Sequence, residues 1–125
     1  MGLLGNLFSK KEDEFSDFNN WIPLDSMLQL NEIVAKSNSK TQAIFKHSTR
    51  CGVSSMVIRQ FEKQFNLSED EIDLYYLDLL RFRDISNAIA TKFQVAHQSP
   101  QLIVIKDKKI VAHDSHHGIL SVKLN

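Results

Sequence analysis

Residues 43–61 read AIFKHSTRCGVSSMVIRQF and join a short apolar run, a polar loop and an amphipathic segment. The mostly apolar residues 43–47 predict a buried strand. Residues 53–65 predict a helix, because apolar side chains recur there at helical spacing: Met56, Val57, Phe61 and Phe65. The loop between the two carries Cys51, so we expect this cysteine where a strand leads into the N-terminus of a helix.

The segments on either side of this unit continue an alternation of helices and strands. Upstream, Ser26 and Gln29 have the capping-box spacing, which predicts a helix over about residues 26–36. Downstream, the pattern predicts a strand, a helix, an antiparallel hairpin and a final half-helix, at residues 72–80, 83–93, 101–106 with 109–113, and 115–125. This order predicts an α/β fold with a central mixed sheet of about four to five strands flanked by helices.

The composition indicates one compact domain. A chain of 125 residues with 42% hydrophobic residues can bury one core, and we expect a flexible N-terminal arm over residues 1–20 before a single domain over residues 21–125. The 15 Lys and Arg residues balance the 15 Asp and Glu residues, which disfavours binding to nucleic acid or to an anionic membrane. No apolar run approaches the roughly 20 residues that span a bilayer, and we expect no signal peptide.

Cys51 is the single cysteine of the chain. It cannot form a disulfide within its own chain, which favours a reducing, cytoplasmic location. A thiol attacks as the thiolate, and helix N-terminal amides and nearby cations stabilise that anion. The groups expected to do so here are the amides of Gly52, Val53 and Ser54 and the side chains of Arg50 and His47. The alternative is an unreactive cysteine packed like a small apolar residue.

Two further features bear on thiol chemistry. Ser54 stands three residues after Cys51, where dithiol oxidoreductases carry a second cysteine, so an adduct at Cys51 would need another molecule's thiol to resolve it. This spacing alone is a weak signal. Ser99-Pro100 precedes a predicted strand, and a cis bond there would leave the backbone of Ser99 free to pair with a bound thiol or peptide. Proline at the start of a strand also has an ordinary structural explanation.

Together these segments resemble the monothiol bacilliredoxin family of thioredoxin-like proteins, over about residues 21–119. The likeness is carried by FKHSTRC, RDISN, HQSPQ and SH, at residues 45–51, 83–87, 97–101 and 115–116. The resemblance implies a thioredoxin-like fold, a cis-proline corner at Ser99-Pro100, and Cys51 as the nucleophile that takes bacillithiol from protein mixed disulfides. It implies no bound cofactor, bacillithiol as co-substrate, and bacillithiolated proteins with bacillithiol or a partner reductase as partners.

Some positions depart from the family pattern or extend it. Gly52 follows the cysteine where the family often has proline, and the hairpin turn at residues 107–109 lacks the usual glycine. Bacillithiol carries carboxylates, which require cationic or hydrogen-bonding partners. The candidates for holding them are Arg50, Lys46, Arg83 and His97, although a solvated surface group explains each equally well.

Three functions stay open from the residues alone. The first is removal of bacillithiol from protein mixed disulfides, and the second is a glutaredoxin-like enzyme for another small thiol. The third is a non-catalytic thioredoxin-fold module that docks partners at the Ser99-Pro100 corner. We expect a monomer without a metal, because His113, His116 and His117 lack the spacing of a closed four-ligand site.

Overall fold

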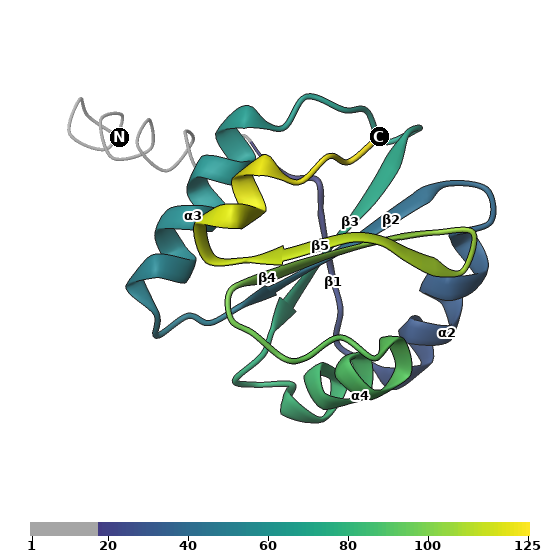
Figure 1. The fold of residues 1–125 in the computed structure, drawn as a ribbon, viewed down its shortest axis with the longest axis horizontal. Helices are drawn as coiled ribbons and strands as arrows, with labels where there is room; N and C mark the ends of the chain where they lie inside the picture. Colours follow the sequence, from purple (N-terminus) through teal and green to yellow (C-terminus); the bar gives the residue numbers. More distant parts are fainter. Residues whose placement is uncertain (1–17) are drawn as a thin grey trace, which may run out of the picture.

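The computed structural model describes residues 18–125 as one five-stranded mixed sheet with helices on both faces (Figure 1). The strand order is β1-β3-β2-β4-β5. In chain order the elements are β1 (Trp21–Pro23), α2 (Met27–Lys36), β2 (Thr41–His47), α3 (Gly52–Gln64), β3 (Ile72–Asp78), α4 (Arg83–Phe93), β4 (Gln101–Lys106), β5 (Lys109–Ser115) and the 3-10 helix η1 (His116–Ser121). The predicted α/β class and thioredoxin-like architecture are confirmed. No helix among residues 18–125 is both long and apolar enough to cross a membrane.

Strand β2 is the centre of the sheet, parallel to β3 and antiparallel to β4. All of its residues are buried, because the strand has a neighbour on each side and helices over each face. Successive side chains point to opposite faces of a strand. Phe45 therefore packs in the cluster under α3 and η1, whereas Ile44 packs in the cluster under α2 and α4 (Figure 1).

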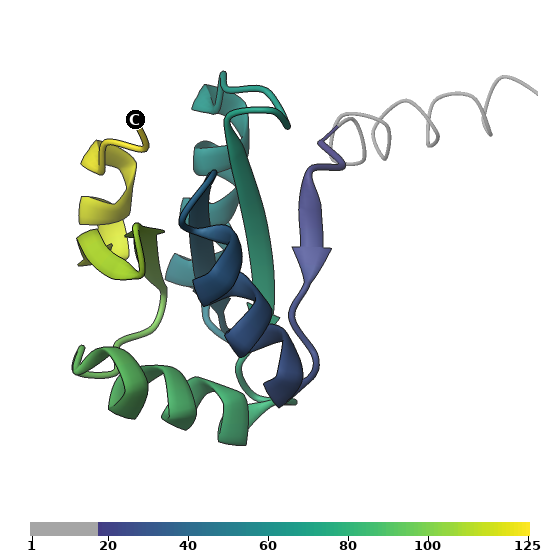
Figure 2. The same cartoon turned by 90° about the vertical axis from the view of Figure 1, so that its right-hand side faces the viewer.

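Strand β1 was not expected from the sequence, which predicted a helix as the first element. Its three residues are too few to show alternation, and its pairing depends wholly on β3, with Trp21 opposite Leu74. Figure 2 shows β1 at one edge of the sheet and β5 at the other. Trp21 secures the edge: its ring stacks on Phe61, and its indole nitrogen donates to Glu62 at 2.6 Å.

Residues 1–17 of the expected N-terminal arm lie outside the described residues. Phe18, also assigned to that arm, is partly buried and contacts two aromatic rings of the domain. Its ring lies 5.5 Å from that of Trp21 and 5.7 Å from that of Phe65, between ring centres. Such aromatic pairs add to the apolar burial. Phe18 therefore packs against the domain.

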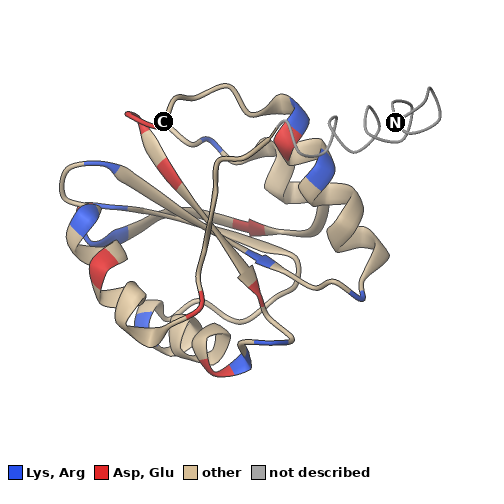
Figure 3. Ribbon diagram, turned by 180° about the vertical axis from the view of Figure 1, so that it is seen from behind, with Lys and Arg blue, Asp and Glu red and all other residues tan. Residues whose placement is uncertain are grey.

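The other elements lie close to their predicted positions. Helix α4 has the expected bounds. Helix α2 begins one residue later than predicted, and α3 begins and ends one residue earlier than predicted. Strand β5 runs two residues further than predicted, to Ser115, before η1 turns the chain back against α3. Lys, Arg, Asp and Glu are interspersed over the helices and strands, in keeping with the balanced composition (Figure 3).

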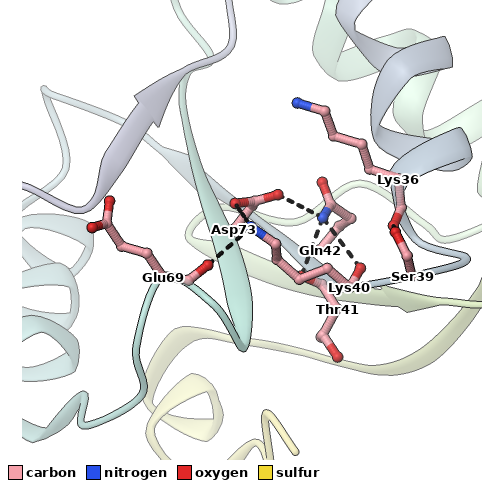
Figure 4. A network of polar contacts seen from close by, with 7 residues as sticks. All are labelled: Lys36, Ser39, Lys40, Thr41, Gln42, Glu69 and Asp73. Carbon is pink, nitrogen blue, oxygen red and sulfur yellow. Dashed lines mark hydrogen bonds and ion pairs between the residues drawn. The ribbon is translucent and has the colours of Figure 1, made fainter.

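A polar network ties the beginnings of β2 and β3 together, at one end of the sheet (Figure 4). Lys40 donates to the carboxylate of Asp73 at 3.0 Å and to the backbone carbonyl of Glu69 at 2.9 Å. The buried amide of Gln42 donates to the other carboxylate oxygen of Asp73 at 2.8 Å. Since β2 and β3 are parallel, this network holds their register at the end remote from the turn that carries Cys51.

Candidate functional site

Cys51 lies at the junction of β2 and α3, as the sequence predicts. It is a free, partly exposed cysteine and occupies the N-cap position of α3, with extended backbone angles. Its carbonyl accepts the first helical hydrogen bond, from the amide of Ser55 at 3.1 Å, and no side-chain hydrogen bond caps the helix. The thiol therefore belongs to the residue that precedes the amides of the first helical turn, which have no partner within the helix.

Gly52 is the first residue of α3 and is exposed. A Cβ atom at this position would meet nothing within 4 Å, and the backbone does not need a positive φ. Glycine is therefore not required here by steric crowding or by backbone conformation. Its consequence is a helix start with more conformational freedom in the unfolded chain than other residues would give.

Ser54 and His47 bind each other beneath the turn that carries Cys51. Ser54 is fully buried, and its hydroxyl oxygen lies 2.7 Å from Nδ1 of His47. The same oxygen accepts the backbone N–H of Ser48 at 3.1 Å. Burial, opposed by the charge of Asp78, lowers the pKa of His47 and favours its neutral form. The Ser54 hydroxyl thus joins the end of β2 to α3, a contact called the clip below. A neutral His47 brings no cationic charge to the thiol, contrary to the expectation that it stabilises the thiolate.

The cis bond predicted at Ser99-Pro100 is present. Pro100 is buried and directly precedes β4, and its carbonyl accepts the backbone N–H of His116 at 3.0 Å. Strand β4 runs antiparallel to β2, with Gln101 opposite Lys46. The start of β4 therefore lies beside the end of β2, and Figure 1 shows both turns at the same end of the sheet. Pairing of the strands brings the cis-proline corner to the Cys51 turn.

The basic side chains expected near this corner divide into exposed and buried groups. Arg50 is exposed in the turn before Cys51, and Arg83 is exposed as the first residue of α4. His97 is exposed, and burial followed by the charges of Lys46 and Arg83 lowers its pKa, which places those two cations in its surroundings. Lys46 is 0% exposed, so a ligand in solvent has no access to its ammonium group, contrary to the expectation that it binds carboxylates directly.

Gln101 is a site-supporting residue that the sequence analysis did not single out. It is 2% exposed, and its side chain donates to the carbonyl of Ala96 at 3.0 Å and accepts the N–H of Gln98 at 3.4 Å. These contacts hold the segment that leads to the cis-proline corner. The available signal was a polar residue at the head of the apolar run of residues 102–105, but its partners depend on how the loop folds.

Residues 22–124 match the family described as monothiol bacilliredoxin BrxC. The chain belongs to this family. The match covers every element from β2 to η1, including the Cys51 turn and the cis-proline corner. The family and the fold assign the protein a thiol redox role.

Solved structures share the same fold. One is a thioredoxin-fold protein proposed to be an oxidoreductase, which is 33% identical, with 79% of this chain and 85% of that chain covered and a TM-score of 0.67. Two thioredoxins are more distant in sequence. The Malassezia sympodialis protein is 20% identical over 76% of this chain and 77% of its own, with a TM-score of 0.59. The Trypanosoma brucei brucei protein is 16% identical over 81% and 82%, with a TM-score of 0.58.

The histidines near the C-terminus contribute no metal centre to the described part of the chain. Within residues 18–125, no group of three or more His, Cys, Asp or Glu side chains is placed to hold a metal ion. His113 lies in β5, and His116 and His117 begin η1. His116 takes part in the site in another way, because its backbone N–H contacts the carbonyl of Pro100.

Proposed function

We propose that the protein removes bacillithiol from protein mixed disulfides, with Cys51 as the nucleophile. The observation that carries this proposal is the partly exposed Cys51 at the uncapped start of α3, in a chain of the monothiol bacilliredoxin family. Ser54 supports the monothiol mechanism, because its buried hydroxyl occupies the position of a resolving thiol and is already hydrogen-bonded. An adduct at Cys51 therefore waits for a thiol from another molecule.

The reaction proceeds by two thiol–disulfide exchanges. The Cys51 thiolate first attacks the bacillithiol sulfur of the mixed disulfide. A disulfide forms between Cys51 and bacillithiol, the original disulfide breaks, and the client leaves as a thiolate that takes a proton from water. A second bacillithiol thiolate, or a thiol of a partner reductase, then attacks the bacillithiol sulfur and releases Cys51. With bacillithiol as reductant, the client gains two electrons and two bacillithiol molecules become one disulfide.

The groups around Cys51 divide the work of binding. The backbone of Ser99, next to the cis bond, supplies an extended edge for the bound thiol or for the client. Arg50, Arg83 and His97 are exposed at this end of the domain and hold the carboxylates of bacillithiol. The enzyme needs no bound cofactor and acts as a monomer, with bacillithiol as co-substrate. We place the reaction in the cytoplasm, where free thiols remain reduced.

The test is intact mass after incubation with oxidised bacillithiol and, in parallel, with oxidised glutathione. The wild-type protein should gain one bacillithiol per chain, faster than it gains glutathione, and Cys51→Ser should gain neither. Equal rates with the two disulfides would favour a glutaredoxin-like enzyme for another thiol. Absence of any adduct on the folded wild-type protein would refute the proposal and favour a binding module.

A second measurement follows turnover on a bacillithiolated client protein. Release of the first client thiol per enzyme should require Cys51 alone, whereas repeated turnover should also depend on added bacillithiol, because the described domain contains no second cysteine to regenerate Cys51. Cys51→Ser is the matched control, since it changes one atom at the N-cap and serine is itself a good N-cap residue. Client release at the same rate by the wild type and by Cys51→Ser would exclude catalysis by this thiol.

A further inference from the structure

A buried polar cluster lies between the sheet and α4, next to the segment that leads to the cis-proline corner. Lys46 is fully buried in β2, and its ammonium nitrogen lies 3.1 Å from the carbonyl oxygen of Ser86 and 3.3 Å from Nδ1 of His97. The hydroxyl of Ser86, which is also fully buried, lies 3.3 Å from the same ring nitrogen. A strand and a helix thus place two side chains against one nitrogen of His97.

The chemistry of these groups determines where the imidazole carries its proton. A lysine ammonium is a donor only, so Nδ1 of His97 must accept the hydrogen bond from Lys46. A neutral imidazole that accepts at Nδ1 carries its hydrogen on Nε2. Burial and the two neighbouring cations, Lys46 and Arg83, lower the pKa of His97 and so favour the neutral ring. His97 is therefore a neutral ring whose free donor is Nε2–H.

Burying the ammonium group of Lys46 lowers the stability of the fold, so filling space in the core does not explain why a lysine stands at this position. Among the residues that the structure describes, Lys46 has no carboxylate partner, and a buried ammonium group without one is expensive. Burial lowers the pKa of Lys46 to about 8, so the group still carries its proton at neutral pH. A methionine would fill similar space without that cost.

We propose that Lys46 is a positioning residue that holds His97 as the Nε2–H tautomer, so that this exposed ring donates a hydrogen bond to a carboxylate of the small-thiol substrate. His97 lies two residues before Ser99, in the segment to which the Gln101 side chain is hydrogen-bonded through the carbonyl of Ala96. The exposed ring therefore belongs to the segment that leads directly into the cis-proline corner. The inference rests on the proposed function for the identity of the carboxylate, whereas the tautomer itself follows from the contacts of Lys46 and Ser86.

The tautomer can be measured in the wild-type protein without any substitution. Long-range 1H–15N correlation spectra of the histidine rings at pH 7 distinguish a protonated ring nitrogen from an unprotonated one. For His97 we expect an unprotonated Nδ1 and a protonated Nε2. A ring protonated at Nδ1, or a rapidly averaging mixture of the two tautomers, overturns the proposal whatever the activity of the protein. In Lys46→Met the spectrum should move toward such a mixture.

The kinetic test asks whether Lys46 acts through His97. Lys46→Met should raise KM for a bacillithiol mixed disulfide about tenfold to a hundredfold, the range of one hydrogen bond to a charged group, with kcat within a factor of about two. His97→Ala should have a similar effect, and Lys46→Met should add nothing to it, because residues that act through one contact are not additive. Lys92→Met, which removes an exposed charge from the last turn of α4, should leave KM unchanged.

A neutral substrate separates failure of this proposal from failure of the proposed function. With the mixed disulfide of 2-mercaptoethanol, which has no carboxylate, KM should be equal in the wild type, Lys46→Met and His97→Ala. An equal KM increase on both substrates would overturn the carboxylate contact and indicate a general disturbance of the corner. If the wild type does not prefer bacillithiol over glutathione, the proposed function fails, while the His97 spectrum still decides whether Lys46 sets the tautomer.

Discussion

Replacing Ser54 by alanine tests the clip that joins the end of β2 to α3. In the wild type, the Ser54 hydroxyl accepts the N–H of Ser48 and bonds to Nδ1 of His47, at 3.1 Å and 2.7 Å. All three residues are buried, and the exposed fractions are 0% for Ser54, 6% for His47 and 9% for Ser48. Water therefore cannot easily replace the lost oxygen.

The magnitude follows from the two groups left without a partner. A buried polar group that loses its hydrogen bond costs about 1–3 kcal/mol. Partial relaxation of the turn offsets some of this, so we expect Ser54→Ala to lower the free energy of unfolding by about 2–4 kcal/mol. For a domain of this size the midpoint of thermal unfolding should fall by about 8–16 °C.

The assay is urea unfolding followed by the fluorescence of Trp21, the single tryptophan, and by circular dichroism. Ser55→Ala is the matched control, because Ser55 is the next residue of the same helix turn and its hydroxyl makes no hydrogen bond within residues 18–125. It should change stability by less than about 0.5 kcal/mol. Equal stabilities of Ser54→Ala and the wild type would show that the Ser54 hydroxyl does not stabilise the contact between β2 and α3.

Three further predictions concern charge and backbone. Burial lowers the pKa of His47 in the folded state, so as pH falls the unfolded chain binds a proton before the folded chain does, and the free energy of unfolding decreases below pH 6.5. In His47→Asn this decrease should be smaller, as measured by denaturant titrations at pH 7 and pH 5. Burial lowers the pKa of Lys46 from 10.5 to about 8, so the stability of the wild type should rise between pH 8 and pH 10.5, by up to about 3 kcal/mol. Lys46→Met should lack this rise. Gly52→Pro should raise the free energy of unfolding by about 0.5–1 kcal/mol, measured as a higher urea midpoint, because the first helical position tolerates proline and Cys51 already has an extended backbone. A lower urea midpoint would show that the amide of Gly52 has a hydrogen-bond partner.

The elements that were predicted well are those with a long periodic pattern. Helix α4 shows four apolar residues on one face and was located to the residue, and the β4-β5 hairpin was found from two short runs around a turn. Strand β1 escaped prediction because its three residues, ending in Pro23, become a strand only by pairing with β3. A local pattern cannot report a partner more than 50 residues away.

The site shows the same division between local and long-range information. Cys51 and Ser99-Pro100 could be found from the sequence, because a lone cysteine after a strand and a proline before a strand are local signals. The burial of Lys46 could not, since it depends on α4 and on the segment after it closing over β2. Ser54 could be placed three residues after the thiol, but its two hydrogen-bond partners are the last residue of β2 and the first residue after it, on the other side of Cys51.

The sequence by itself determined which atom is available for thiol chemistry and which fold presents it. One cysteine at a strand-to-helix junction excludes an internal disulfide, and periodicity sets the order of helices and strands. Only the tertiary structure decided which polar groups face the substrate and which are enclosed. Lys46 and His97 are 51 residues apart, and neighbouring strand positions point to opposite faces, so their contact exists only once β2, α4 and β4 have packed together.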